Sequence, residues 1–246
     1  MKRLFRGVFS ILAASPLLLA AKQAIHTPAS NFPSQANLST SMQILLLMTV
    51  LTLLPALIVC LTPFLRLSIV LHFLRQALGT QTVPSNQVLV GLSLFLSLIV
   101  MQPVLSNMYT AAWQPLEEGS IGYQQALEAG SAPLRQFLLH FAREKDIQLF
   151  LEISKSPAPA TPNDLSLSIL GPAYILSEIK VAFQIGAVLF LPFLVIDIVV
   201  ASVSLSVGMV QLPPVMISAP FKILLFVVVD GWTLLVGSLM KGLTQT

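Results

Sequence analysis

The chain has 246 residues, of which 55% are hydrophobic and only 9% are charged, with a formal net charge of +3 at pH 7. Soluble domains carry about 25% charged residues, so most of this surface must face lipid or other protein. The basic residues are spread along the chain without a cluster that could follow a nucleic-acid backbone, so no nucleic-acid partner is expected.

Residues 1–21 have the pattern of a secretory signal peptide. Three basic residues precede the apolar run Val8–Ala20, and small residues follow it. The cleavage motif is imperfect, because Leu18 or Leu19 would occupy the −3 position, and a retained signal anchor is the alternative. Residues 22–41 are rich in Ser, Asn and Pro and predict a flexible linker.

Residues 42–112 predict a first helical hairpin. It is formed by two long apolar runs, Ile44–Leu65 and Val88–Tyr109, each nearly free of charge and long enough to cross a bilayer. Prolines predict kinks in both runs because they remove a helical hydrogen bond. These prolines are Pro55, Pro63 and Pro103.

Residues 113–171 differ in kind, with seven acidic and four basic residues, and predict a small water-exposed helical module. Apolar residues recur at helical spacing, which predicts one amphipathic helix over about 133–154. Phe137, Phe141 and Phe150 lie on its apolar side. That side has two interpretations, an intramolecular core face or a contact face toward a neighbouring subunit.

Residues 172–246 predict a second helical hairpin, with apolar runs Ala173–Ser206 and Val215–Leu243 joined by the connector 207–214. If the mature N-terminus is translocated, the positive-inside rule places Arg66 and Arg75 on the cytoplasmic side. The acidic module then faces the periplasm, and the connector points toward the cytoplasm.

The apolar second hairpin contains charged residues that include Glu178, Lys180, Asp197, Lys222 and Asp230. An unpaired charge at bilayer depth costs about 2.5–3.5 kcal/mol on insertion scales, so these charges need partners on another helix or chain. They are interpreted as ion pairs that fix helix register, as a proton or ion relay, or as charges that reach toward an interface. We expect Glu178 to pair with Lys222, across a subunit boundary.

No catalytic or metal-binding pattern occurs in the sequence. The three histidines lie on different segments, and the lone Cys60 has no neighbouring ligand at metal-binding spacing. Phosphate-loop and nucleophile-turn motifs are absent from the sequence. We therefore expect no enzyme activity, no metal and no cofactor.

Several long segments resemble the FliP family of flagellar export-gate proteins. The resemblance covers about residues 45–242, and its segments occur in the family's order. They are Pro172–Phe183 (PAYILSEIKVAF), Leu191–Ser202 (LPFLVIDIVVAS), Pro220–Trp232 (PFKILLFVVVDGW), Leu212–Pro214, Leu74–Thr80, Pro84–Gln87 and Trp113–Pro115.

The resemblance implies an all-α fold of long, kinked, membrane-type helices with a small periplasmic module, assembled into a ring-like helical oligomer. The implied partners are further copies of the chain, FliQ and FliR subunits, other membrane proteins of the export apparatus, unfolded flagellar substrates and membrane lipid. The implied place is the bacterial inner membrane within the flagellar basal body. Much of the apolar surface would then face sister subunits instead of lipid.

The family also implies a methionine gate in the connector between the last two apolar runs. Here the connector contains Met209, whose flexible side chain could seal a pore and move aside, although Gln211 would weaken a dry seal. The implied function is a channel subunit for flagellar protein export. The alternatives are the equivalent subunit of a virulence secretion system and a proton-coupled transporter that uses Glu178 and Asp197.

Overall fold

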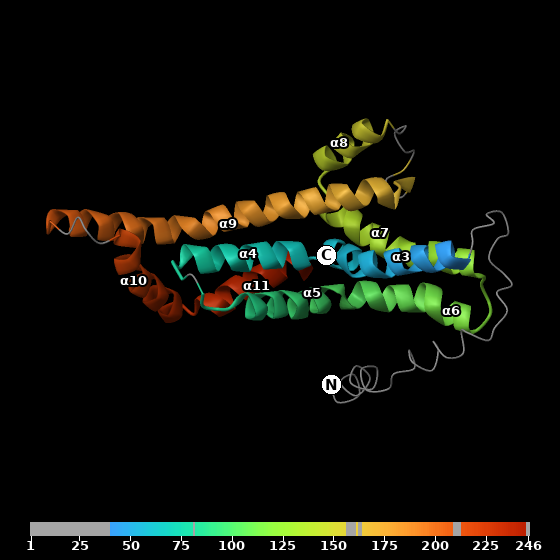
Figure 1. Cartoon of the computed structure of the whole chain (residues 1–246), viewed down its shortest axis with the longest axis horizontal. Helices are drawn as coiled ribbons and strands as arrows, with labels where there is room; N and C mark the ends of the chain where they lie inside the picture. The colour runs from blue at the N-terminus through green and yellow to red at the C-terminus, as the bar shows by residue number, and fades with distance from the viewer. Residues whose placement is uncertain (1–39, 81, 156–160, 162–163, 209–212, 245–246) are drawn as a thin grey trace, which may run out of the picture. The chain divides into compact units, whose positions relative to one another are not determined.

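The computed structural model describes residues 40–80, 82–155, 161, 164–208 and 213–244 (Figure 1). The predicted signal peptide, nearly all of the predicted linker, and Met209 lie outside the described residues. The chain divides into two compact units, Met1–Val50 and Leu51–Thr246. In the first unit the structure describes only the start of one helix.

The described residues are helical and contain no strand, which confirms the predicted all-α class. In chain order the elements are α3 (Thr40–Cys60), α4 (Phe64–Ala77), α5 (Asn86–Met108), the π-helix η1 (Tyr109–Trp113), α6 (Gln114–Glu117), α7 (Tyr123–Phe141), α8 (Glu144–Ser154), α9 (Leu167–Ser206), α10 (Pro214–Val228) and α11 (Gly231–Thr244).

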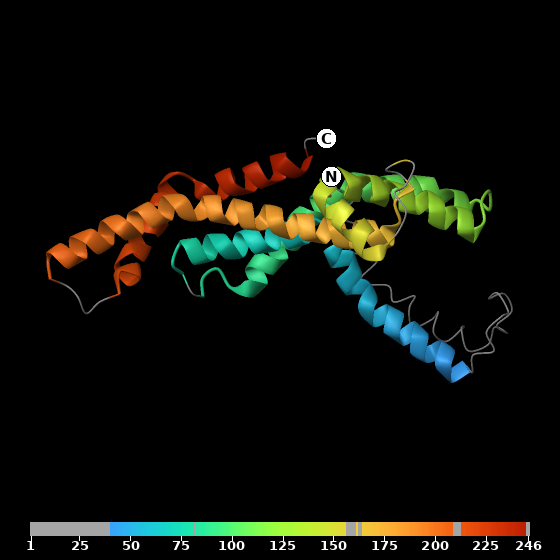
Figure 2. The same ribbon diagram turned by 90° about the horizontal axis from the view of Figure 1, so that it is seen from above.

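Helix α4 forms the buried centre of the second unit. It lies between α9 and α5, and α11 runs back along the same bundle after α10 has crossed from the end of α9 (Figures 1 and 2). One stripe of α4 is fully buried at the i, i+3, i+4, i+7 spacing of a core-facing helix. These residues are Leu67, Val70, Leu71 and Leu74, which pack with Leu235, Leu239 and Leu243 of α11 in one core.

The predicted single amphipathic helix over 133–154 is wrong, because two helices occupy this stretch. Ala142 and Arg143 have extended backbone angles, so α7 ends and α8 leaves in another direction. The backbone N–H of Arg143 donates to Ser177 Oγ of α9 at 2.9 Å. This bond compensates for the helical hydrogen bonds lost at the break.

The fourth apolar run is also broken, since α10 and α11 meet at an angle of 66°. Asp230, at the bend, has a φ of 49°, a left-handed conformation that Asp tolerates better than most residues. Phe226 and Trp232 pack edge to face across the bend, with ring centroids 5.4 Å apart. A continuous helix over Val215–Leu243 is therefore incorrect.

The close packing of α4 on α9 depends on Gly186. A Cβ at this position would lie 2.4 Å from Cδ2 of the Phe73 ring. We expect Gly186→Ala to force α4 and α9 apart and to destabilise the chain by about 2 kcal/mol. Thermal unfolding in detergent checks this, with Gly237→Ala as the control, because nothing lies within 4 Å of that position. Equal melting temperatures for the two variants would contradict the packing argument.

Among the described residues, three helices are long and apolar enough to cross a membrane. The bent pair of α10 and α11 would be a fourth span if the two helices cross the membrane together. The three are Met42–Cys60, Asn86–Glu117 and Leu167–Ser206. The apolar surface of α3 and of the C-terminal half of α9 is largely uncovered by the part of the chain that the structure describes. This surface must meet lipid or other chains.

Candidate functional site

Helix α9 carries three ion pairs that join it to three different helices. Glu178 pairs with α4, Lys180 with α8, and Asp197 with α10. Each pair therefore fixes the register of α9 against one neighbour, and together they tie the apolar hairpin to the rest of the second unit.

The pair between Arg66 and Glu178 is the most buried of the three. Arg66 Nε donates to Glu178 Oε2 at 2.9 Å, and its Nη2 donates to Oε1 at 2.5 Å. The Glu178 side chain is fully buried, and the Arg66 guanidinium also lies over the Phe141 ring, 5.3 Å from its centroid. A two-pronged pair of this kind fixes both distance and orientation between α4 and α9.

The predicted pairing of Glu178 with Lys222 is wrong, because each residue has a different partner within the chain. Lys222, nearly buried on α10, donates to Asp197 Oδ2 at 2.7 Å and to the carbonyl of Ala77 at 3.1 Å. Ser218 Oγ donates to the other Asp197 oxygen at 2.5 Å. Ala77 is the last residue of α4, where a helix dipole favours a cation.

The third pair joins α8 to α9 through Asp146. Its buried carboxylate accepts hydrogen bonds from Lys180 and from Ser177 Oγ, the latter at 2.7 Å. Arg143 also donates to Gln184 of α9 at 2.6 Å. Burial alone would raise the pKa of Asp146, but the two hydrogen bonds and the nearby Lys180 and Arg143 charges lower the pKa below its ordinary value.

The lowered pKa of Asp146 gives a pH prediction. The ionised form stabilises the folded chain, so its contribution is complete above the unfolded-state pKa of about 4 and is lost as pH falls through the lower folded-state value. We expect Asp146→Asn to weaken the docking of α8 at neutral pH and to flatten the loss of stability below about pH 4. Hydrogen exchange of α8 against pH checks this. The exposed Glu144→Gln on the same helix is the control, and an unchanged profile for Asp146→Asn would contradict the assignment.

Sequence reasoning found four of these six charges but not how they pair, and it did not identify Arg66 and Asp146 as partners. Arg66 and Asp146 lie outside the second hairpin, in segments assigned to other parts of the fold. Arg66 could have been recognised as a partner from its position, because it directly follows an apolar run, where a charged side chain needs a counter-charge. Asp230 lies exposed at the bend between α10 and α11 and forms no ion pair with the part of the chain that the structure describes.

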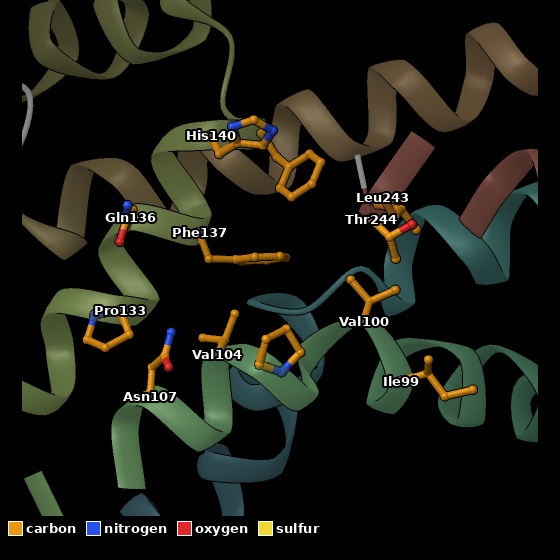
Figure 3. Close-up of a pocket in the computed structure, with 12 residues that line it drawn as sticks. Ile99, Val100, Val104, Asn107, Pro133, Gln136, Phe137, His140, Leu243 and Thr244 are labelled. Carbon is orange, nitrogen blue, oxygen red and sulfur yellow. The ribbon is translucent and has the colours of Figure 1, made fainter. Parts of the chain in front are cut away.

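Two of the three phenylalanines predicted to form a contact face line one cavity. Phe137 and Phe141 of α7 face a space of about 510 Å³ that α5 and the end of α11 close from the other sides. Figure 3 shows Phe137 pointing from α7 toward Val104 and Val100. Phe150 is half-buried on α8 and does not line this cavity.

The described residues contain no group of three or more His, Cys, Asp or Glu side chains that could hold a metal ion. The connector is described only at its ends, where Gly208 follows α9 with a φ of 82° and Pro213 precedes α10. The described residues therefore provide three ion pairs along α9 and exposed apolar helices, and the centre of the connector lies outside them.

The model of the FliP family matches residues 47–239 of the chain. The flagellar biosynthetic protein FliP of Borreliella burgdorferi is 43% identical over 97% of this chain and 96% of its own length. The protein of the same name from Pectobacterium carotovorum is 50% identical, and the match covers 82% of this chain and 78% of that protein. The one from Bacillus subtilis is 46% identical, and the match covers 84% of this chain and 93% of that protein.

Proposed function

Because the chain belongs to the FliP family, a membrane component of flagellar biosynthesis and export, we propose that it is a core channel subunit of the flagellar type III export gate. In this role several copies surround a pore through which unfolded flagellar proteins cross the inner membrane. The observation that supports the proposal most directly is family membership over nearly the whole described chain.

The distribution of apolar surface also supports a multi-subunit role. The charges of Glu178, Asp197 and Lys222 are paired inside the chain, whereas the long apolar helices leave most of their outer surface uncovered. Such a subunit needs apolar partners more than it needs ionic ones. The proposed partners are further copies of the chain, FliQ and FliR subunits, other export membrane proteins and lipid.

The proposed location is the inner membrane within the flagellar basal body, with the acidic module of residues 113–171 on the periplasmic side. The charge asymmetry of the sequence supports this orientation, since Arg66 and Arg75 follow the first apolar run and the acidic residues follow the second.

The gate of the proposed pore is Met209, between α9 and α10. The assignment rests on the sequence and on the family, because Met209 lies outside the described residues. We expect Met209→Ala to raise the ion conductance of the assembled complex, since the shorter side chain cannot close the constriction. Planar-bilayer recording checks this, with the exposed Met216→Ala as control. Unchanged conductance with normal export would contradict the gate.

Two other functions would use some of the same features. A virulence-type export subunit would share the helical hairpins, but the three relatives described above are named for flagellar biosynthesis. A proton-coupled transporter would need carboxylates that exchange protons with water. Glu178 is fully buried and held by Arg66, which favours a structural role for that residue.

Genetic complementation tests the proposed function. The gene should restore swimming and filament growth to a flagellate strain that lacks its own FliP-family protein, together with export of flagellar subunits into the medium. Restored secretion of virulence effectors in a strain lacking the virulence counterpart, with no restored swimming, would replace the flagellar assignment by the virulence one.

A further inference from the structure

The cavity between α5, α7 and the end of α11 has the size and depth of a ligand site. Its volume of about 510 Å³ lies within the range of about 300–1,000 Å³ that is usual for sites of small molecules. Val100 and Leu243 line it although only 4% and 3% of their surface is exposed, so the cavity reaches into the core of the second unit. Packing in such a core depends on atoms that contact the lining on every side.

The cavity forms where α5 and α7 diverge. Beyond one end of it the chain segments approach closely, since a Cβ on Gly130 of α7 would lie 3.1 Å from the Cβ of Ala112 in η1. The cavity walls further along contain Pro103 of α5 and Pro133 of α7. A proline inside a helix removes one backbone hydrogen bond and disturbs the preceding turn. The shape of the site is therefore built into the backbone of both helices.

The lining is apolar over most of its area. None of the described residues that line the cavity is Asp, Glu, Lys or Arg. The α7 wall contains the rings of Phe137 and Phe141, whose centroids lie 5.0 Å apart, and Val104 lies on the α5 wall. Thr244 also lines the cavity, but its hydroxyl donates to the carbonyl of Met240 at 2.8 Å. A charged ligand meets no counter-charge here, whereas a hydrocarbon chain is matched to the walls.

Polar side chains lie mainly toward one end of the cavity. Figure 3 shows the exposed amides of Asn107 and Gln136 at the end nearer η1. The opposite end is formed by Ile99 and Leu243, and Asn107 lies about 12 Å further along α5 than Ile99. His140, on the last turn of α7, is also exposed. A ligand with a polar head and an apolar tail matches this gradient, since amide groups both donate and accept hydrogen bonds.

The apolar end of the cavity continues into an exposed apolar surface of α5. Ile99 lines the cavity and keeps 55% of its surface exposed, and the neighbouring Leu98 is 51% exposed. The stretch Asn86–Glu117, which contains both residues, is long and apolar enough to cross a membrane. The tail of a membrane lipid therefore reaches the cavity without leaving apolar surroundings, whereas a water-soluble ligand would have to cross that apolar surface.

We propose that the cavity binds one acyl chain of a membrane phospholipid, with the glycerol ester groups at Asn107 and Gln136 and the chain end toward Val100 and Leu243. The site rests on membrane insertion of α5 and does not depend on the export channel. In the orientation proposed above, α5 returns toward the periplasm, so the lipid belongs to the periplasmic leaflet. The bound chain completes the packing of α5, α7 and α11.

A photoactivatable phospholipid tests the site directly. The full chain is purified with its export partners and reconstituted in vesicles of phosphatidylethanolamine that carries a diazirine in the middle of one acyl chain. Irradiation should attach this probe to Val100 and Leu243, which bulk lipid does not reach because they are nearly buried. A probe with the diazirine on its headgroup should label Asn107 or Gln136 instead. Labelling by the tail probe of exposed residues such as Leu98 alone would overturn the site.

A variant that fills the cavity gives a matched comparison. Val104→Trp places an indole in the space that Phe137 faces, and it should lower the tail labelling of Val100 roughly tenfold, because overpacking opposes binding of the chain. Leu98→Trp adds the same side chain to an exposed position of α5 outside the cavity, and it should leave that labelling unchanged. Equal labelling of Val100 in the two variants would overturn the site.

Thermal unfolding gives a second measurement with smaller substitutions, which keeps the test decisive if the Trp variant fails to fold. Adding phosphatidylethanolamine to the delipidated complex should raise its melting temperature, because a ligand that binds only the folded chain stabilises it. The rise should be smaller for Val104→Phe and unchanged for Leu98→Phe. Equal rises for these two variants would contradict a lipid in the cavity.

The outcomes separate the lipid site from the proposed function. A chain that restores swimming but gives no tail label on Val100 and Leu243 would overturn the site alone. A chain that carries this label but restores no swimming would overturn the export function and leave the site. A photoreactive amino acid in place of Val104 should link to lipid, and a link to another protein segment would overturn the site.

Discussion

Replacement of Glu178 by glutamine is expected to destabilise the chain by about 3–5 kcal/mol and to abolish swimming. The change leaves the guanidinium of Arg66 buried between α4 and α9 without its counter-charge, and breaking one side of a buried pair has a cost of this size. Thermal unfolding of the detergent-solubilised chain measures the first effect, and a swimming assay in the complemented strain measures the second.

The effect of Glu178→Gln should be reversible by removing its partner. Arg66→Met with Glu178→Leu replaces the pair by apolar side chains of similar size, so most of the lost stability should return. Glu144→Gln, an exposed carboxylate on α8, is the control and should change little. A double variant as unstable as Glu178→Gln would show that the pair is not what holds α4 to α9.

Replacement of Lys222 by alanine is expected to destabilise the chain by about 3 kcal/mol and to impair export. The ammonium group donates both to Asp197 and to the Ala77 carbonyl, and hydrogen bonds to charged groups contribute about 1.5–3 kcal/mol each. The Asp197 side chain keeps 27% of its surface exposed, so water compensates for part of the loss. Hydrogen exchange should then rise in α10, next to the proposed gate.

Two comparisons make the Lys222 prediction specific. Lys241→Ala removes an exposed lysine from the neighbouring α11 and should leave exchange in α10 unchanged. Lys222→Ala with Asp197→Asn should recover part of the stability, because the stranded carboxylate is also removed. If Lys222→Ala unfolds α4 and α9 as strongly as Glu178→Gln does, the effect of Lys222 is not local to α10.

The all-helical class followed from the sequence because a long apolar run in a membrane must satisfy its own backbone hydrogen bonds, and it does so as an α-helix. The break between α9 and α10 also followed, but the breaks at Ala142–Arg143 and at Val229–Asp230 did not. Ala142–Arg143 lacks Gly and Pro, and the break there is stabilised by a hydrogen bond from Arg143 to Ser177, which lies 34 residues away. A local pattern contains no information on such a contact.

Four of the five charges predicted to need partners, Glu178, Lys180, Asp197 and Lys222, form ion pairs with the described chain and Asp230 does not, and the pairings themselves were not predicted. Arg66 and Glu178 are 112 residues apart, and Lys222 lies 145 residues from Ala77. Insertion energetics indicates that a buried charge requires a counter-charge, and it does not say which helix supplies it. The packing of α9 on α4, which depends on the absence of a side chain at Gly186, decides that question.

We propose that this chain forms a pore with further copies of itself and with other export subunits. Native mass spectrometry of the detergent-extracted complex, purified from cells that make the chain together with its FliQ and FliR partners, tests it most directly. We expect one dominant species that contains several copies of this chain together with those partners. A chain that leaves the membrane as a lone monomer, under conditions where the partners are stable, would contradict it.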